Sequence, residues 1–263
     1  MPAPKSEDVA LLIDAAERAG DIALRHFSGD RTPTQKPGGQ GPVTDADLEV
    51  DAALRTQLLA ARPGYGWLSE ETPDNAARLA CEHVFIIDPI DGTRAFVDGR
   101  KSWAHSLAIV RGGAVVAAVV FLPALERMYV AGLGDGAQLN GARIEVDPGA
   151  NEGDEILAAR PNFSDDRWPG GVTPMRRAFR SSLANRLALV AEARFAAMLS
   201  LREVWDWDVA AGALLVTEAG GNASTPTGAS LNFNQEHAMQ PGILAAPRQL
   251  HQQLVARLTP PAA

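Results

Sequence analysis

One segment constrains the fold of this chain more than any other, residues 86–96, which read IIDPIDGTRAF. Its apolar start predicts a buried strand over 84–88, and Pro89 prevents that strand from continuing with ordinary hydrogen bonding. A Pro followed by Asp-Gly is also common in turns, so the simplest interpretation is a turn. A second interpretation explains more of the residues: the strand brings Asp88 and Asp91 into a tight turn, and a helix begins just beyond.

This arrangement of residues has a chemical consequence. Carboxylates at the end of a strand can bind a hard divalent cation, with the Ile90 carbonyl as a further oxygen ligand. Gly92 allows close approach of the backbone, and the N–H groups of Gly92 and Thr93 would face an anion at the start of a helix. The segment therefore indicates a place where a metal ion and a phosphate meet.

The composition is that of an ordinary globular protein. The chain has 263 residues, of which 46% are hydrophobic and 21% charged, so it can form one large domain or two joined halves. Its net charge of −8 argues against a nucleic-acid polymer or an anionic membrane as partner. Cys81 is the one cysteine, and we find no signal peptide and no bilayer-spanning run, so we expect a cytoplasmic protein.

Hydrophobic periodicity and turn residues predict the order of elements. Helices are expected at 6–27, 44–61, 183–199, 208–219 and 247–258, and strands at 84–88, 107–110, 114–122, 127–131 and 156–159. We expect a mobile loop over 28–42, which includes Lys36, and turns over 132–141. The order predicts an α/β or α+β layered sandwich. We divide it into an N-terminal half (1–145) and a C-terminal half (146–263) that form one compact unit.

Three further segments supply acidic residues, and each also has a purely structural interpretation. In GPVTDAD (41–47), Thr44 and Asp47 fit a helix capping box. In LSEET (68–72), adjacent glutamates fit a solvated loop, or else the segment ends a strand with Glu70 pointing inward. In WDWDVAAG (205–212), Asp208 fits a helix cap, ahead of small residues that permit close packing.

Together and in this order, the four segments resemble the inositol monophosphatase superfamily of magnesium-dependent, lithium-sensitive phosphatases. The matching pieces are GPVTDAD, LSEET, IIDPIDGTRAF and WDVAAGALLVTEAGG, which lie between residues 41 and 221. The resemblance implies the alternating helix and sheet layers of inositol monophosphatases and fructose-1,6-bisphosphatases. It also implies two to three Mg²⁺ ions per site, with Mn²⁺ as a possible substitute, and a small phosphate ester as substrate.

The resemblance further implies which residues hold the metal. One ion would be bound by Glu70, Asp88 and the Ile90 carbonyl. A second would be bound by Asp88, Asp91 and Asp208, and a weaker third would lie near Glu70. All-oxygen ligands favour magnesium or manganese over zinc.

The remaining implied roles concern water and phosphate. Thr93, paired with Asp47, would position and help deprotonate the attacking water, with assistance from Glu70. The backbone groups of Gly92 and Thr93 would bind the phosphate. Two ions about 4 Å apart can stabilise the attacking and leaving oxygens of such a displacement.

Members of this superfamily cleave inositol monophosphates, 3′-phosphoadenosine 5′-phosphate, fructose 1,6-bisphosphate or histidinol phosphate. Three details favour the bacterial 3′(2′),5′-bisphosphate nucleotidases: GTRAF at 92–96, the W-x-W-D pattern at 205–208, and LNFN at 231–234. We therefore expect hydrolysis of 3′-phosphoadenosine 5′-phosphate to AMP. A second phosphate would need a further cation such as Arg94 or Lys36.

The inositol-specific features are weaker in this sequence. Ser181 and Ser182 replace a Gly-Thr pair, and Glu203 is out of register with the glutamate that contacts an inositol hydroxyl. Arg94, Ser182 and Glu203 remain weak candidates for substrate contact. Inositol-1-monophosphatase is the main alternative, followed by phosphatases of histidinol phosphate or fructose 1,6-bisphosphate.

Other expectations are less specific. A catalytically silent binder of a phosphorylated metabolite is a remote alternative, because every implied metal ligand is present. The histidines show no metal-ligand spacing, and the two tryptophans near Asp208 fit packing better than stacking on a purine. By family analogy a homodimer is possible.

Overall fold

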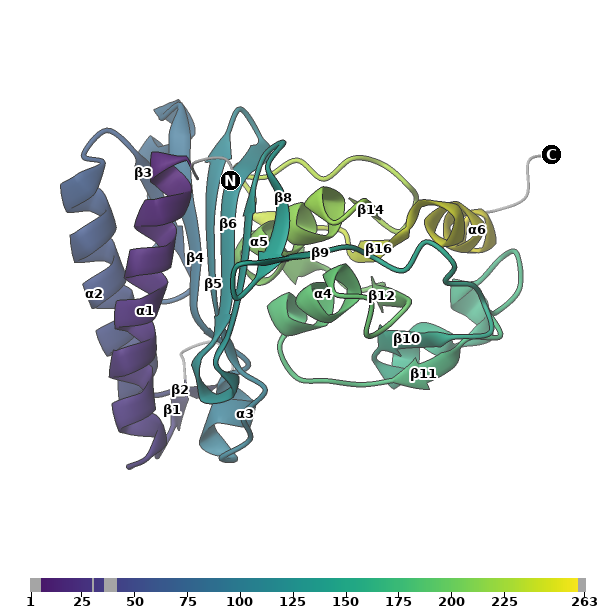
Figure 1. The fold of residues 1–263 in the computed structure, drawn as a ribbon, viewed down its shortest axis with the longest axis horizontal. Helices are drawn as coiled ribbons and strands as arrows, with labels where there is room; N and C mark the ends of the chain where they lie inside the picture. The colour runs from purple at the N-terminus through teal and green to yellow at the C-terminus, as the bar shows by residue number, and fades with distance from the viewer. Residues whose placement is uncertain (1–5, 30, 36–41, 260–263) are drawn as a thin grey trace.

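The computed structural model describes residues 6–29, 31–35 and 42–259. Helices and sheets lie in successive layers (Figure 1): two helices, a large sheet, two more helices, a second sheet and a last helix. This arrangement confirms the predicted layered sandwich of helices and sheets.

The helices follow the expected order. They are α1 (Glu7–Phe27), α2 (Asp45–Ala61), α3 (Thr93–Val97), α4 (Leu183–Ala191), α5 (Asp206–Glu218) and α6 (Arg248–Leu258). The strands of the large sheet are β3 (Gly66–Ser69), β4 (His83–Asp91), β5 (Ala104–Arg111), β6 (Ala114–Leu122), β7 (Arg127–Gly132), β8 (Gly136–Leu139) and β9 (Ala142–Ile144). The second sheet contains β10 (Glu155–Ala158), β11 (Arg176–Ala178), β12 (Ala197–Ser200), β14 (Gly221–Ser224) and β16 (Ile243–Pro247).

The large sheet has the strand order β3-β4-β5-β6-β7-β8-β9, with β3 parallel to β4 and every other pair antiparallel. Strand β4 is buried on both faces. Val84 and Ile86 belong to the core on the α4/α5 side, whereas Phe85 and Ile87 belong to the core on the α1/α2 side. Alternation along the strand thus gives two apolar faces. That explains the uninterrupted apolar run before the acidic turn.

The second sheet has the order β11-β10-β12-β16-β14 and packs on α4 and α5 from the other side. Its far face forms a third core with Leu250 and Leu254 of α6. The middle core contains residues from both sides of position 145, for example Val120 and Leu215. The predicted boundary between residues 145 and 146 stays a prediction. If the two predicted halves form one compact unit, they must share a core of this kind.

One predicted helix is wrong in its second half. Helix α4 ends at Ala191, and the chain turns through Ala193, whose φ is 63°. The apolar run that follows forms β12, which lies between β10 and β16 in the middle of the second sheet. A short run that is buried on all sides has no helical or strand period, so its sequence does not distinguish the two.

Two segments predicted as irregular contain short strands. Residues 132–141 include β8, which pairs with β7. Within 28–42, β1 (Thr34–Gln35) pairs with β2 (Pro42–Val43), while Lys36 lies outside the described residues. The last two short strands, β13 (Val204–Trp205) and β15 (Met239–Gln240), pair with each other beside the start of α5.

Candidate active site

Three aspartates converge where β4 meets α5. Asp88 and Asp91 lie at the end of β4, and Asp208 lies in the first turn of α5. Each offers a carboxylate oxygen within 4.8 Å of the others. The pairing of β4 with β5 shifts between Asp88 and Asp91, so β4 continues three residues beyond the predicted end through an irregularity at Pro89. This bulge directs both carboxylates toward one place.

The Asp88 carboxylate shows most clearly that the cluster suits a cation. Asp88 is 1% exposed, and its Oδ1 has no hydrogen-bond partner in the described part of the chain. Burial raises the pKa of Asp88 well above its usual range, and the charges of Glu70, Asp91 and Asp208 raise it further. Burying a carboxylate without a partner costs free energy. A divalent cation with oxygen ligands would remove both the repulsion and the unsatisfied oxygen.

The other two aspartates are held by backbone and hydroxyl donors. Burial raises the pKa of Asp91 to about 6, although Ser182 Oγ (2.6 Å) and the Ala184 N–H (2.7 Å) both donate to its Oδ2. Burial and the charge of Asp91 raise the pKa of Asp208, whose Oδ2 accepts from the Trp205 N–H at 3.3 Å. These donors fix the orientation of the two carboxylates, whose negative charges still repel each other.

A buried histidine supports the turn between the aspartates. Burial lowers the pKa of His105 to about 4, so the ring is neutral at physiological pH. Its Nδ1–H donates to the Pro89 carbonyl. This bond holds the backbone between Asp88 and Asp91, which includes the Ile90 carbonyl.

The predicted pairing of Thr93 with Asp47 is present. Asp47 Oδ1 lies 3.2 Å from Thr93 Oγ1, and Asp47 Oδ2 accepts from the N–H and the hydroxyl of Thr44 at 2.8 and 2.6 Å. Asp47 therefore takes part in the capping of α2 and also contacts the turn after β4. Thr93 Oγ1 lies equally close, at 3.2 Å, to the Ile90 carbonyl.

Gly92 is required by the backbone. Its φ is +96°, in the left-handed region that favours glycine, and it forms the N-cap of the short helix α3. A Cβ here would be in ordinary van der Waals contact with Ser182, whose Cβ and N lie 3.4 and 3.5 Å from the position it would take. The positive φ, and not a lack of space, is therefore what requires glycine at this position.

Glu70 directly follows β3. Asp51, which the sequence did not indicate as a site residue, holds the turn around Glu70. The Glu70 N–H donates to the Ile87 carbonyl at 3.2 Å, which keeps Glu70 beside β4. Asp51 on α2 is buried and accepts from Ser69 Oγ at 2.5 Å and Thr72 Oγ1 at 2.6 Å. Asp47 and Asp51 are four residues apart and share one face of α2. That spacing is the signal that could have identified Asp51.

A second missed residue is Arg186 on α4. It is 8% exposed, its Nε donates to the Arg180 carbonyl at 2.6 Å, and its guanidinium lies 4.4 Å from the centroid of the Phe179 ring. Burial lowers the pKa of Arg186 to about 10, although the negative charges of Asp91 and Asp208 act to raise it. Arg186 therefore brings a buried positive charge close to the acidic cluster.

The weakly predicted substrate residues occupy different environments. The Ser182 hydroxyl binds Asp91 and also caps α4 by accepting from the Asn185 N–H at 2.9 Å. Arg94 and Glu203 are both exposed, on α3 and just before β13. Their contact with substrate stays a prediction.

The LNFN segment has a structural function. Asp206 is fully buried and accepts from the Asn234 N–H at 2.9 Å and from the Gln240 side chain at 2.7 Å. Arg78 also donates to the Asn234 side chain at 2.6 Å. Asp206 is thus a buried anchor at the start of α5.

A cavity of about 810 Å³ opens beside Glu70. Its wall includes Leu68, Trp205, Trp207 and Met239. Among the described residues that line it, none is Lys or Arg. The cavity joins a predicted metal ligand to a wall rich in aromatic and apolar side chains.

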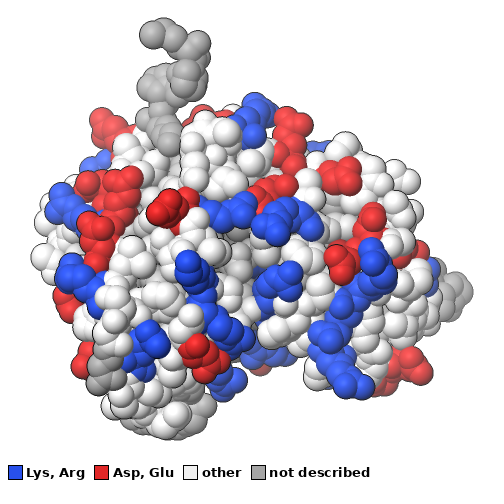
Figure 2. All heavy atoms as spheres, turned by 60° about the horizontal axis from the view of Figure 1, so that its bottom comes forward, with Lys and Arg blue, Asp and Glu red and all other residues white. Residues whose placement is uncertain are grey.

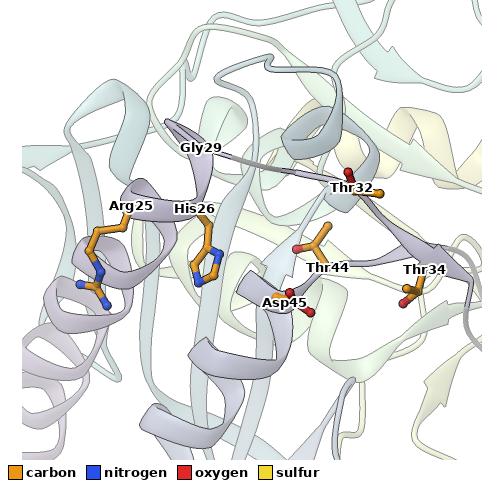
Figure 3. A pocket seen from close by; sticks show the side chains of 7 residues that line it. All are labelled: Arg25, His26, Gly29, Thr32, Thr34, Thr44 and Asp45. Carbon is orange, nitrogen blue, oxygen red and sulfur yellow. The ribbon is translucent and has the colours of Figure 1, made fainter.

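A smaller hollow of about 530 Å³ lies between the end of α1 and the start of α2 (Figure 3). Arg25 and His26 line it from α1, and both bind the Glu49 carboxylate, at 3.2 and 2.7 Å. The three clustered aspartates are absent from the described lining of both cavities, but of the two only the larger is lined by Glu70 and by the two tryptophans that lie close to Asp208 in the chain. We therefore assign the candidate active site to the larger cavity.

Charge is unevenly distributed over the surface. On the face shown in Figure 2, Lys and Arg side chains gather across the middle, although the chain as a whole carries −8. The net charge therefore describes the molecule and not each face. In the described part of the chain, no helix is both long and apolar enough to cross a bilayer.

Comparisons with known proteins agree with this geometry. The model of the inositol monophosphatase family matches residues 5–260. The inositol-1-monophosphatase of Rhizobium meliloti is 34% identical over 223 residues, which cover 80% of this chain and 82% of that protein. That of Caulobacter vibrioides is 33% identical over 264 residues, covering 94% and 99%.

A solved structure extends the agreement to three dimensions. An inositol monophosphatase from Thermotoga maritima superposes with a TM-score of 0.81 at 26% identity, covering 96% of both chains. Fold, acidic cluster and sequence similarity lead to one conclusion. The chain belongs to the inositol monophosphatase family and is a phosphoric monoester hydrolase.

Proposed function

We propose that this enzyme is a Mg²⁺-dependent phosphatase that hydrolyses inositol monophosphate. The observation that carries the proposal is the convergence of Asp88, Asp91 and Asp208, with an unsatisfied buried oxygen on Asp88. The curated relatives described above are inositol-1-monophosphatases. We also propose that the enzyme is cytoplasmic.

The acidic residues divide into two metal-binding groups in this proposal. Asp88, Asp91 and Asp208 would hold one ion, and Glu70, Asp88 and the Ile90 carbonyl another. A third, weaker ion would lie near Glu70. When bound, Mg²⁺ would neutralise charge on the phosphate and lower the pKa of a water molecule.

The remaining residues position the water and the phosphate. When Thr93 Oγ1 donates its proton to Asp47, its lone pairs face away from that carboxylate and can accept a hydrogen bond from the attacking water. Glu70 would assist in taking up the proton. The N–H groups of Gly92 and Thr93 would hold the phosphate oxygens as charge develops on them.

The substrate assignment replaces our first expectation, which was 3′-phosphoadenosine 5′-phosphate. The relatives' names favour inositol phosphate, and LNFN has a structural function as an anchor for α5. A second phosphate would need a cation, yet the described lining of the cavity beside Glu70 has no Lys or Arg. These observations favour a monophosphate.

The test is phosphate release with Mg²⁺ on four substrates in parallel: inositol 1-phosphate, 3′-phosphoadenosine 5′-phosphate, fructose 1,6-bisphosphate and histidinol phosphate. We expect the highest kcat/KM for inositol 1-phosphate and no release after chelation of the metal. Preference for the adenosine bisphosphate would refute the inositol assignment and leave the metal site intact. Absence of release from all four, with Mg²⁺ bound, would support a non-catalytic binder instead.

A further inference from the structure

Arg78 is a buried arginine that lies behind the wall of the larger cavity. It belongs to the segment that joins β3 to β4, and its side chain is only 1% exposed. Its Nε and Nη2 donate to the two oxygens of Asp74 at 2.7 and 2.8 Å, which is the bidentate geometry of a strong ion pair. Asp74 itself lines the cavity. The guanidinium thus holds the segment that follows Glu70.

The same guanidinium binds a second segment, which begins 156 positions further along the chain. Nη1 donates to Asn234 Oδ1 at 2.6 Å. Nη2 donates to the Gln235 carbonyl at 3.1 Å and lies 3.5 Å from the Glu236 carbonyl. Residues 236–239 line the cavity. Arg78 therefore connects two parts of the cavity wall that are distant in sequence.

Asn234 has a backbone conformation that suits this contact. Its φ is 60°, in the left-handed region that asparagine tolerates better than most other non-glycine residues. Its N–H donates to Asp206 Oδ2 at 2.9 Å, so Asn234 binds the start of α5 through its backbone and Arg78 through its side chain. The segment at Asn234 is thereby fixed relative to the helix that carries Asp208.

Stability alone does not account for an arginine at this position. A buried guanidinium loses its hydration, and apolar residues of similar volume often stabilise a protein as well as a buried ion pair does. A planar group with five N–H donors can, however, hold several loop oxygens in one geometry, which apolar packing does not do. At Arg78, the oxygens that are held belong to the wall of the cavity beside Glu70 and to the residues next to it.

We propose that Arg78 and Asn234 form a clamp that sets the shape of the substrate cavity and determines how tightly the alcohol part of the phosphate ester binds. This inference rests on the proposed phosphatase function and adds two positioning residues to it. With the clamp intact, both wall segments are ordered in advance, so substrate binding does not have to order them. Asp91 and Asp208 are held by other donors, so the clamp should affect KM and leave kcat largely unchanged.

Arg78→Gln would leave Asp74 without its partner and endanger folding, so the test uses Asn234→Gly. Glycine accepts the positive φ, and the side-chain bond to Arg78 is lost. With saturating Mg²⁺, KM for inositol 1-phosphate should rise about tenfold, the size expected from losing one hydrogen bond to a charged group. The kcat and the Kd for Mg²⁺ should stay near their wild-type values. Asn234→Asp keeps an acceptor oxygen for Arg78 and should retain a KM close to that of wild type.

Asn140→Gly is the matched control. Asn140 also has a positive φ, of 48°, and its side chain accepts from the Met128 N–H at 2.8 Å, but it lies outside the described lining of the cavity. This variant should leave KM unchanged. An unchanged KM in Asn234→Gly, an equal rise in Asn234→Asp, or a loss confined to kcat would overturn the clamp.

A second measurement separates failure of the clamp from failure of the proposed function. Absence of Mg²⁺-dependent release from inositol 1-phosphate by the wild-type enzyme would refute the proposed function. The clamp is then tested by hydrogen exchange in the substrate-free enzyme, which does not depend on the identity of the substrate. Exchange over 234–239 should be faster in Asn234→Gly than in wild type or Asn140→Gly. Equal exchange in all three proteins would overturn the clamp.

Discussion

Each buried carboxylate in this site costs free energy unless a cation or a donor offsets its charge. Asp91 has donors from Ser182 and Ala184, and its pKa is still raised to about 6 from an ordinary value of 3.8. Asp88 has an oxygen without a partner among the described residues. Individual residues therefore favour metal binding and disfavour the metal-free state at neutral pH.

The first prediction is a pH dependence of the metal-free protein. A folded-state pKa above the unfolded value contributes stability at low pH that is lost as the pH rises through the folded pKa. For Asp91 that window runs from about 4 to about 6. The unfolding temperature of chelator-treated protein should therefore decrease over this range, and less so in Asp91→Asn. Equal pH profiles for the two proteins would contradict the assignment of Asp91.

The second prediction concerns Arg186, whose charge lies close to Asp91 and Asp208. A guanidinium near these carboxylates attracts a phosphate and repels metal cations. Arg186→Gln should raise KM for the phosphate ester and lower the Kd for Mg²⁺, each by about two- to tenfold, a modest electrostatic effect. Arg176→Gln, at an exposed position on β11, is the control. A change in kcat alone would argue against this role.

Among the elements, α2 supports the site from two positions. Asp47 contacts the turn after β4, and Asp51 holds the turn that carries Glu70. One helix face thus aligns two segments that supply predicted metal ligands. The capping box at the start of α2 fixes Asp47 as it caps the helix.

The third prediction follows from this arrangement. Asp51→Ala leaves the buried Ser69 hydroxyl without its acceptor, which should cost about 1–3 kcal/mol of unfolding free energy. The turn around Glu70 should also loosen, so Mg²⁺ should bind about 10–100-fold more weakly, as for other residues that orient metal ligands. Arg55→Gln, at an exposed position on the same helix, is the control. Loss of stability with unchanged Mg²⁺ affinity would limit Asp51 to a structural role.

The sequence predicted the elements and residues that depend on local pattern. The acidic end of β4, the capping box and the WD motif are each read from neighbouring residues. The contacts of Asp51 and Arg186 depend on pairing between distant segments, which local pattern does not encode. The residues of β12 form a short apolar run that is buried on all sides, so they show neither the helical nor the strand spacing of apolar residues. The sequence therefore predicts that the helix before β12 continues through it.

Across the whole molecule, the acidic cluster lies where the large sheet meets α5. Asp88 and Asp91 belong to the large sheet, and Asp208 belongs to α5, which packs between the two sheets. A cation bound by all three would connect residues that are more than a hundred positions apart.

The fourth prediction is that Mg²⁺ stabilises the folded protein. A ligand that binds only the folded state adds about 2.7 kcal/mol when its free concentration is 100 times its Kd. The unfolding temperature at pH 7.5 should rise with Mg²⁺ and return after chelation. The rise should be smaller in Asp91→Asn. A rise of equal size in both proteins would indicate that the ion binds elsewhere.

The most direct measurement of the central claim is phosphate release from inositol 1-phosphate as Mg²⁺ is increased, for wild type, Asp91→Asn and the surface control Asp98→Asn. Asp91→Asn removes a charge with little change in volume, so it should fold normally. We predict at least about a 100-fold loss of kcat, because even residues that only orient metal ligands contribute 10–100-fold. Asp98→Asn should retain normal turnover. Near-normal turnover by folded Asp91→Asn would contradict the claim that this carboxylate cluster binds the catalytic metal.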